Sequence, residues 1–144
     1  MGDTTVSLAQ MTSQYEEHGA EYPSASLKDG GAATIDDFCT IILEEANAEG
    51  VRGEVVFEQA MLETGWLQYG GDSGISQYNF AGIGTTGGGV AGVCYPVVQT
   101  GIRSQEQHLK AYACVLALIP YLLDTCIDLF TRWIASFVEC IWQH

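Results

Sequence analysis

Apolar residues recur every three to four positions along much of the chain, which is the spacing of one face of an α-helix. This pattern predicts helices over residues 5–17, 34–49, 53–64 and 101–119. The stretch between the last two, residues 66–99, lacks the helical period and is rich in glycine and aromatic residues. It therefore predicts a separate lobe of loops and short extended segments rather than a fifth helix.

The predicted lobe has the features of a small β-hairpin. A glycine-rich run, Thr85–Gly89, is typical of a tight turn, and residues 90–98 favour a strand. Many of the 17 glycines fall in this part of the chain, but apolar and aromatic residues interrupt them, so the segment is not disordered. The predicted fold class is thus α+β, mainly helical, with a small β-hairpin lobe.

The C-terminal segment predicts one further helix, over residues 120–142, with a wide apolar face and a polar stripe. Its spaced charges exclude a transmembrane helix, which needs about 20 predominantly apolar residues. We expect this helix to pack within the domain, with self-association or binding at a membrane surface as the alternatives. The domain organisation is therefore a lead-in over 1–33, a core over 34–119 and an atypical helix over 120–144.

The formal net charge is −13, from 18 acidic and 5 basic residues. Phosphate binding needs clustered lysine and arginine, so this charge excludes nucleic acid as a partner. It also disfavours electrostatic adhesion to anionic membranes or to walls rich in teichoic acid.

The chain has an odd number of cysteines, and their spacing matches neither a Cys-x-x-Cys motif nor a set of metal ligands. We expect free, mostly buried thiols and a reducing compartment, with no metal and no cofactor. The N-terminus has no basic and apolar segments of a signal peptide, which predicts synthesis in the cytoplasm without one. The five cysteines are Cys39, Cys94, Cys114, Cys126 and Cys140.

The clearest candidate for chemistry is Glu63, near the end of the predicted 53–64 helix. Val56 and Ala60 precede it on the same helix face, so we expect Glu63 to follow an apolar stripe toward the interior. Desolvation disfavours the charged carboxylate, so a carboxyl group beside the Trp66 ring would hold its proton as a general acid must. The alternative is a structural carboxylate, although the helix dipole opposes one at this end.

Four motifs follow one another in a fixed order: Glu63-Thr64-Gly65-Trp66, Asn79-Phe80-Ala81-Gly82-Ile83-Gly84, Tyr95-Pro96, and Gln99-Thr100-Gly101-Ile102-Arg103 leading into His108-Leu109-Lys110-Ala111-Tyr112. Together they resemble the glucosaminidase family of peptidoglycan hydrolases, the lysozyme-like autolysin and endolysin domains. The resemblance covers residues 34–113. It implies a lysozyme-like fold and hydrolysis of the β-1,4 bond after N-acetylglucosamine in peptidoglycan.

The same fold hosts muramidases and lytic transglycosylases, which stay open as alternatives. So does a catalytically weak glycan-binding or assembly module. The implied partner is a peptidoglycan glycan strand, and the implied place of action is the cell wall. A chain without a signal peptide would reach the wall by phage-type release or as part of a larger protein.

The resemblance also implies roles for individual residues beside the general acid Glu63. The second catalytic group is either Asp72, the nearest acid in the lobe, or a group other than Asp72, which is then an ordinary turn residue. Retention and inversion are both open. The candidates for substrate binding are Trp66, Asn79, Phe80, Tyr95 and Tyr112.

Each substrate-binding candidate has a structural alternative. The aromatic rings of Trp66 and Tyr95 can stack on sugar faces or pack in the core, and Phe80 is expected mainly in the core. Asn79 can bind an N-acetyl group or fix the backbone of the lobe. Tyr112 lies on the 101–119 helix and is expected to reach toward Glu63.

Overall fold

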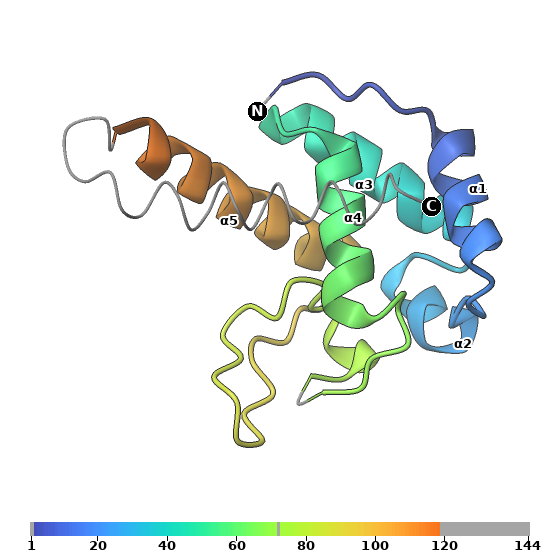
Figure 1. Cartoon of the computed structure of the whole chain (residues 1–144). Helices are drawn as coiled ribbons and strands as arrows, with labels where there is room; N and C mark the ends of the chain where they lie inside the picture. Colours follow the sequence, from blue (N-terminus) through green and yellow to red (C-terminus); the bar gives the residue numbers. More distant parts are fainter. Residues whose placement is uncertain (1, 72, 119–144) are drawn as a thin grey trace. The chain divides into compact units, whose positions relative to one another are not determined.

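The computed structural model describes residues 2–71 and 73–118 and consists there of helices and loops (Figure 1). The chain divides into two units, residues 1–110 and 111–144, with the boundary inside the last described helix. The first unit holds the core and the candidate site. The helix predicted over 120–142 lies outside the described residues.

All four helices predicted from hydrophobic spacing are present, with their ends shifted by a few residues. A short additional helix and two 3-10 helices complete the described secondary structure. The elements are α1 (Leu8–His18), α2 (Ser24–Leu27), η1 (Lys28–Gly30), α3 (Ile35–Glu49), α4 (Gly53–Thr64), η2 (Ile75–Gln77) and α5 (Val98–Leu118).

Local sequence signals explain where the long helices begin and end. Helix α3 begins at a capping box, in which the Thr34 hydroxyl accepts from the Asp37 backbone N–H and the Asp37 carboxylate accepts from the Thr34 N–H. Helices α3 and α4 end at Gly50 and Gly65, whose φ angles of 70° and 57° lie in the left-handed region. Glycine adopts that conformation without a Cβ clash, so each helix stops there.

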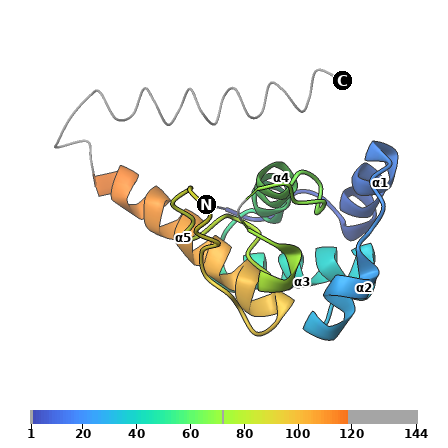
Figure 2. The same ribbon diagram turned by 90° about the horizontal axis from the view of Figure 1, so that it is seen from below.

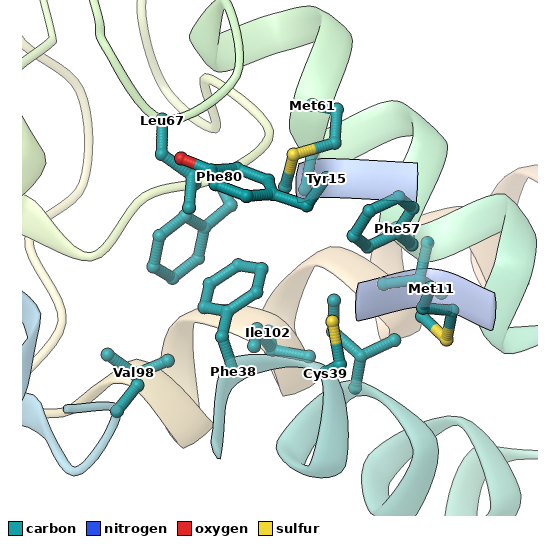
Figure 3. Close-up of a cluster of buried hydrophobic side chains, with 14 of the residues drawn as sticks. Met11, Tyr15, Phe38, Cys39, Phe57, Met61, Leu67, Phe80, Val98 and Ile102 are labelled. Atoms are coloured by element: carbon teal, nitrogen blue, oxygen red, sulfur yellow. The ribbon is translucent and has the colours of Figure 1, made fainter. Parts of the chain in front are cut away.

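The core lies where α1, α3, α4 and the N-terminal part of α5 meet (Figures 1 and 3). Phe38 of α3 packs edge-on against Phe80, with ring centroids 5.0 Å apart, so the loop after η2 is anchored in the same core. The largest fully buried side chains include Tyr15, Phe38, Phe57, Phe80, Met11, Leu27 and Met61.

Helices α3 and α5 lie side by side within the first unit (Figure 2). The Arg103 guanidinium donates to the Glu45 carboxylate from Nε at 2.6 Å and from Nη2 at 2.8 Å. Lys110 lies about two turns further along α5 and pairs with Glu49 at 3.0 Å. These pairs fix the register of α5 against α3.

The predicted β-hairpin lobe is wrong. Between α4 and α5 the described residues form no strand, and an isolated antiparallel bridge joins Gly87 to Val90. The strand predicted over 90–98 is likewise absent, and α5 begins at its last residue. The mainly helical part of the predicted fold class agrees with the structure.

The physical reason is the way this loop segment satisfies its backbone. Side chains take the carbonyl groups that a strand partner would otherwise take: Ser73 and Gln77 both donate to Ala91 O, at 3.0 and 2.8 Å. Glycines with positive φ, among them Gly88 and Gly92, interrupt the extended backbone between these contacts. Hydrogen bonds from side chains therefore hold these loops together in place of the backbone hydrogen bonds of a β-hairpin.

Two further expectations concern the chain as a whole. Within the part of the chain that the structure describes, no helix is long and apolar enough to cross a bilayer. Of the described cysteines, all free thiols, Cys39 is buried as expected, whereas Cys94 and Cys114 are exposed.

Candidate active site

Glu63 lies in the last turn of α4, the helix that Figure 1 labels between α3 and the loop segment. Val56 and Ala60, on the same face of the helix, are fully buried, whereas Glu63 itself is exposed. The expectation that Glu63 points into the interior is therefore wrong. The apolar stripe ends one turn before it, and the carboxyl group is accessible to a ligand.

The Glu63 carboxyl group is nevertheless partly desolvated. Its protein surroundings raise its pKa, and no hydrogen bond or positive charge among the described residues opposes that effect. Burial also raises the pKa of Glu58 on the same helix, but there the Gln14 amide donates to the carboxylate at 2.8 Å. Glu63 thus combines exposure to solvent with a strengthened hold on its proton.

The turn that follows Glu63 is unusual. Gly65, Trp66 and Leu67 have φ angles of 57°, 58° and 64°, so three consecutive residues are left-handed. The Thr64 hydroxyl braces the turn by donating to Ala60 O at 2.7 Å and accepting from Leu67 N at 2.9 Å. The left-handed conformation costs about 1–2 kcal/mol for a non-glycine residue. Such strain persists only where the surroundings hold it, as they often do at functional sites.

Trp66 is partly buried and makes three aromatic contacts. His18 stacks on its ring at 3.9 Å between centroids, with the planes 9° apart. Tyr15 and Phe57 lie at 6.0 and 6.5 Å. Since His18 covers one face of the indole, stacking of a sugar on Trp66 stays a prediction for the remaining surface of the ring.

Asn79 and Phe80 are both buried, and each has a structural role. The Asn79 amide donates to Ile83 O at 2.9 Å and to Val93 O at 3.1 Å, while its oxygen accepts from Ile83 N at 2.9 Å. Its hydrogen-bonding groups therefore hold two loops together. Phe80 has no exposed surface and belongs to the core. We accordingly take neither side chain as a glycan contact.

The remaining candidates are Tyr95, Tyr112 and Asp72, and their predicted roles at the site stay predictions. Tyr95 is partly buried, and its hydroxyl shares a hydrogen bond of 2.7 Å with Ser104 of α5. Tyr112 is 51% exposed and belongs to the second unit, so its predicted contact with Glu63 stays a prediction. Asp72 lies outside the described residues. Among those described, no group of His, Cys, Asp and Glu side chains is arranged to hold a metal ion.

The residues of α1 that contact the turn after Glu63 were not predictable from the sequence as part of the site. Tyr15 showed only the helical spacing of a core residue, and nothing in the sequence distinguished His18. Both lie far from Trp66 along the chain, and a single sequence contains no sign of such a contact.

An accessible, partly desolvated carboxyl group at a helix end fits the general acid of a glycoside hydrolase. Residues 39–125 match the glucosaminidase family, described as mannosyl-glycoprotein endo-beta-N-acetylglucosaminidase. The match covers more than half of the chain, and the chain belongs to this family. Membership indicates a glycoside hydrolase domain.

A relative from Borreliella burgdorferi, described as an uncharacterized protein, is 38% identical over 71 residues. The aligned region is 49% of this chain and 35% of the relative, so the chain spans about a third of that protein's length. No solved structure matches the chain.

Proposed function

We propose that this chain hydrolyses the β-1,4 bond after N-acetylglucosamine in peptidoglycan, at the cell wall, with Glu63 as the general acid. The observation that supports this most is the state of Glu63: exposed, desolvated, and without a hydrogen-bond donor among the described residues. It also lies inside the region that matches the family. A carboxyl group that keeps its proton and still reaches a ligand can donate it to a leaving oxygen.

In the proposed reaction, Glu63 gives its proton to the glycosidic oxygen as the bond from the anomeric carbon to that oxygen breaks. Glu63 becomes a carboxylate, and water supplies the hydroxyl of the new reducing end. A second group either activates this water or first attacks the anomeric carbon. Asp72 is the proposed second group, and the proposal leaves retention and inversion open.

The test compares two substitutions of the same kind on one helix. Glu63→Gln keeps the shape of the side chain and removes the transferable proton, so hydrolysis of purified peptidoglycan should fall roughly 100- to 10,000-fold. Glu58→Gln is the matched control, because Glu58 is a second α4 carboxyl group whose pKa burial raises. It should retain most of the activity. Retention of more than a tenth of the activity by Glu63→Gln would exclude Glu63 as the acid.

Mass spectrometry of the products identifies the bond. A new N-acetylglucosamine reducing end supports the proposal, whereas a new N-acetylmuramic acid end indicates a muramidase. An anhydro end indicates a lytic transglycosylase. Binding of glycan strands without cleavage by the unsubstituted chain would identify a glycan-binding module instead.

A further inference from the structure

Helix α1 lies outside the region that matches the family, yet its C-terminal half contacts the turn that follows Glu63. The match begins at residue 39, whereas α1 spans Leu8–His18. Tyr15 is buried in the core beside Met61 of α4 (Figure 3), and its hydroxyl lies 3.2 Å from the carbonyl oxygen of Trp66. His18, one turn later, stacks on the Trp66 ring.

These contacts belong to a small network around the main chain of Trp66. The Gln68 amide donates to Trp66 O and to Glu21 O, both at 2.9 Å. The Tyr15 hydroxyl reaches the same two carbonyl oxygens, at 3.2 and 3.3 Å. The segment after α1 and the turn after α4 are therefore joined by two side chains that share their acceptors.

Backbone hydrogen bonds that span Glu63 also connect the turn to the end of α4. Trp66 N donates to Met61 O at 2.7 Å, and Gly65 N donates to Leu62 O at 3.3 Å. A movement of Trp66 would therefore pull on the last turn of α4, which carries Glu63. Because the left-handed backbone of Trp66 is intrinsically unfavourable, the turn depends on contacts from outside to keep its place.

We propose that α1 clamps the turn after Glu63, and that Tyr15 and His18 are positioning residues that set the direction of the Glu63 carboxyl group. The inference rests on the proposed function, in which Glu63 is the acid. It extends the catalytic unit to residues before the matched region. A misplacement of a catalytic group by about 1 Å can cost up to about 100-fold in rate, which gives the clamp a measurable effect.

The experiment first removes the ring of His18 that stacks on Trp66 and then replaces it with another planar ring. His18→Ala should lower kcat on soluble peptidoglycan fragments by roughly 10- to 100-fold with KM nearly unchanged, because acid placement and not glycan binding is altered. His18→Phe should recover most of the lost kcat. Glu17→Ala is the control, since Glu17 is exposed and precedes His18 on the same helix. This variant should have the kcat and KM of the unsubstituted chain.

A second variant tests the buried half of the clamp. Tyr15→Phe keeps the ring in the core and removes only the hydroxyl, so it should lower kcat in the same direction. The fall should be smaller, because Gln68 still donates to Trp66 O.

A readout independent of activity separates this inference from the proposed function. NMR can follow the pH titration of the Glu63 carboxyl carbon, whose signal is assigned by its disappearance in Glu63→Gln. His18→Ala should change both the chemical shift of this carbon and the pH midpoint of its titration. If the unsubstituted chain hydrolyses no glycan, the proposed function fails, while this titration still decides whether α1 positions the carboxyl group. An unchanged titration in His18→Ala, or equal losses of kcat in His18→Ala and His18→Phe, would overturn the clamp.

Discussion

At the scale of single residues, Glu58 and Glu63 show how a structural carboxyl group on α4 differs from a candidate general acid. Burial raises the pKa of both Glu58 and Glu63. At Glu58 a hydrogen bond from Gln14 opposes the shift and stabilises the carboxylate in place. At Glu63 no such bond exists among the described residues, and desolvation raises its pKa without an opposing hydrogen bond.

This difference predicts the pH dependence of hydrolysis. A general acid acts only when protonated, so kcat/KM should fall as the pH rises through the pKa of Glu63. Because desolvation raises that pKa, the falling limb should lie above the ordinary glutamate value of about 4.3. A pH–rate profile on soluble peptidoglycan fragments measures it. A limb at the ordinary value, or an identical limb in the residual activity of Glu63→Gln, would assign it to another group.

The place of Glu63 near the end of α4 was predictable from the sequence, because Gly65 marks the end of the predicted helix. The details of its surroundings were not. A tryptophan with positive φ contradicts the usual preference of bulky residues, so no propensity predicts the turn at Trp66. The burial of Phe80 was expected and is confirmed, whereas the burial of Asn79 depends on which loops pack together, because a polar residue beside glycines fits either a core or a cleft.

At the scale of elements, two glycines allow the loop around Tyr78 to approach the helices closely. A Cβ on Gly101 of α5 would lie 1.8 Å from the Tyr78 carbonyl oxygen. A Cβ on Gly30 of η1 would lie 2.7 Å from the Tyr78 ring. Tyr78 itself has a φ of 49°, so this contact holds a strained residue between η1 and α5.

Gly101→Ala should therefore destabilise the protein, although alanine is normally the better helix former by about 1 kcal/mol. The added methyl group meets a backbone carbonyl, which cannot move as a flexible side chain can. The expected loss is about 1–3 kcal/mol or more in the free energy of unfolding, measured by urea denaturation. Gly71→Ala is the control, since nothing lies within 4 Å of its Cβ position and its φ is not positive. A neutral or stabilising Gly101→Ala would contradict the close approach.

The helices were predictable and the lobe was not, for one physical reason. Helical hydrogen bonds are local, so hydrophobic period, Thr34 and Gly65 were enough to predict α3 and α4. The loop between α4 and α5 is held by side chains such as Asn79 that bond to distant backbone groups. Its glycine-rich sequence is equally compatible with a hairpin and with this cross-linked loop, and periodicity does not separate them.

At the scale of the whole molecule, two of the five basic residues of this acidic chain form ion pairs between α3 and α5. Arg103 pairs with Glu45, and Lys110 pairs with Glu49, both across the α3–α5 contact. Within this contact lies Glu106, which is fully buried and whose carboxylate oxygens have no hydrogen-bond partner among the described residues. Burial, together with the negative charges of Glu45 and Glu49, raises the pKa of Glu106 to about 8, against the opposing effect of Arg103.

This buried acid makes the stability of the fold depend on pH. Below the unfolded pKa of about 4.3, Glu106 is protonated in both the folded and the unfolded state, and its titration costs nothing. As the pH rises toward about 8, the unfolded chain releases this proton while the folded chain retains it, so stability falls. The loss is at most about 1.4 kcal/mol for each pH unit, and it levels off above the folded pKa.

Glu106→Gln should remove this dependence, because the amide fills the same space and does not titrate. The free energy of unfolding of the variant, relative to that of the unsubstituted chain, should rise between pH 5 and about pH 8 and then stay constant. Urea denaturation at a series of pH values measures the difference. Glu44→Gln is the control for a glutamate-to-glutamine substitution at an exposed position of α3. If the difference in free energy of unfolding between Glu106→Gln and the unsubstituted chain did not change with pH, Glu106 would ionise alike in the folded and unfolded chain. The α3–α5 contact would then accommodate its charge.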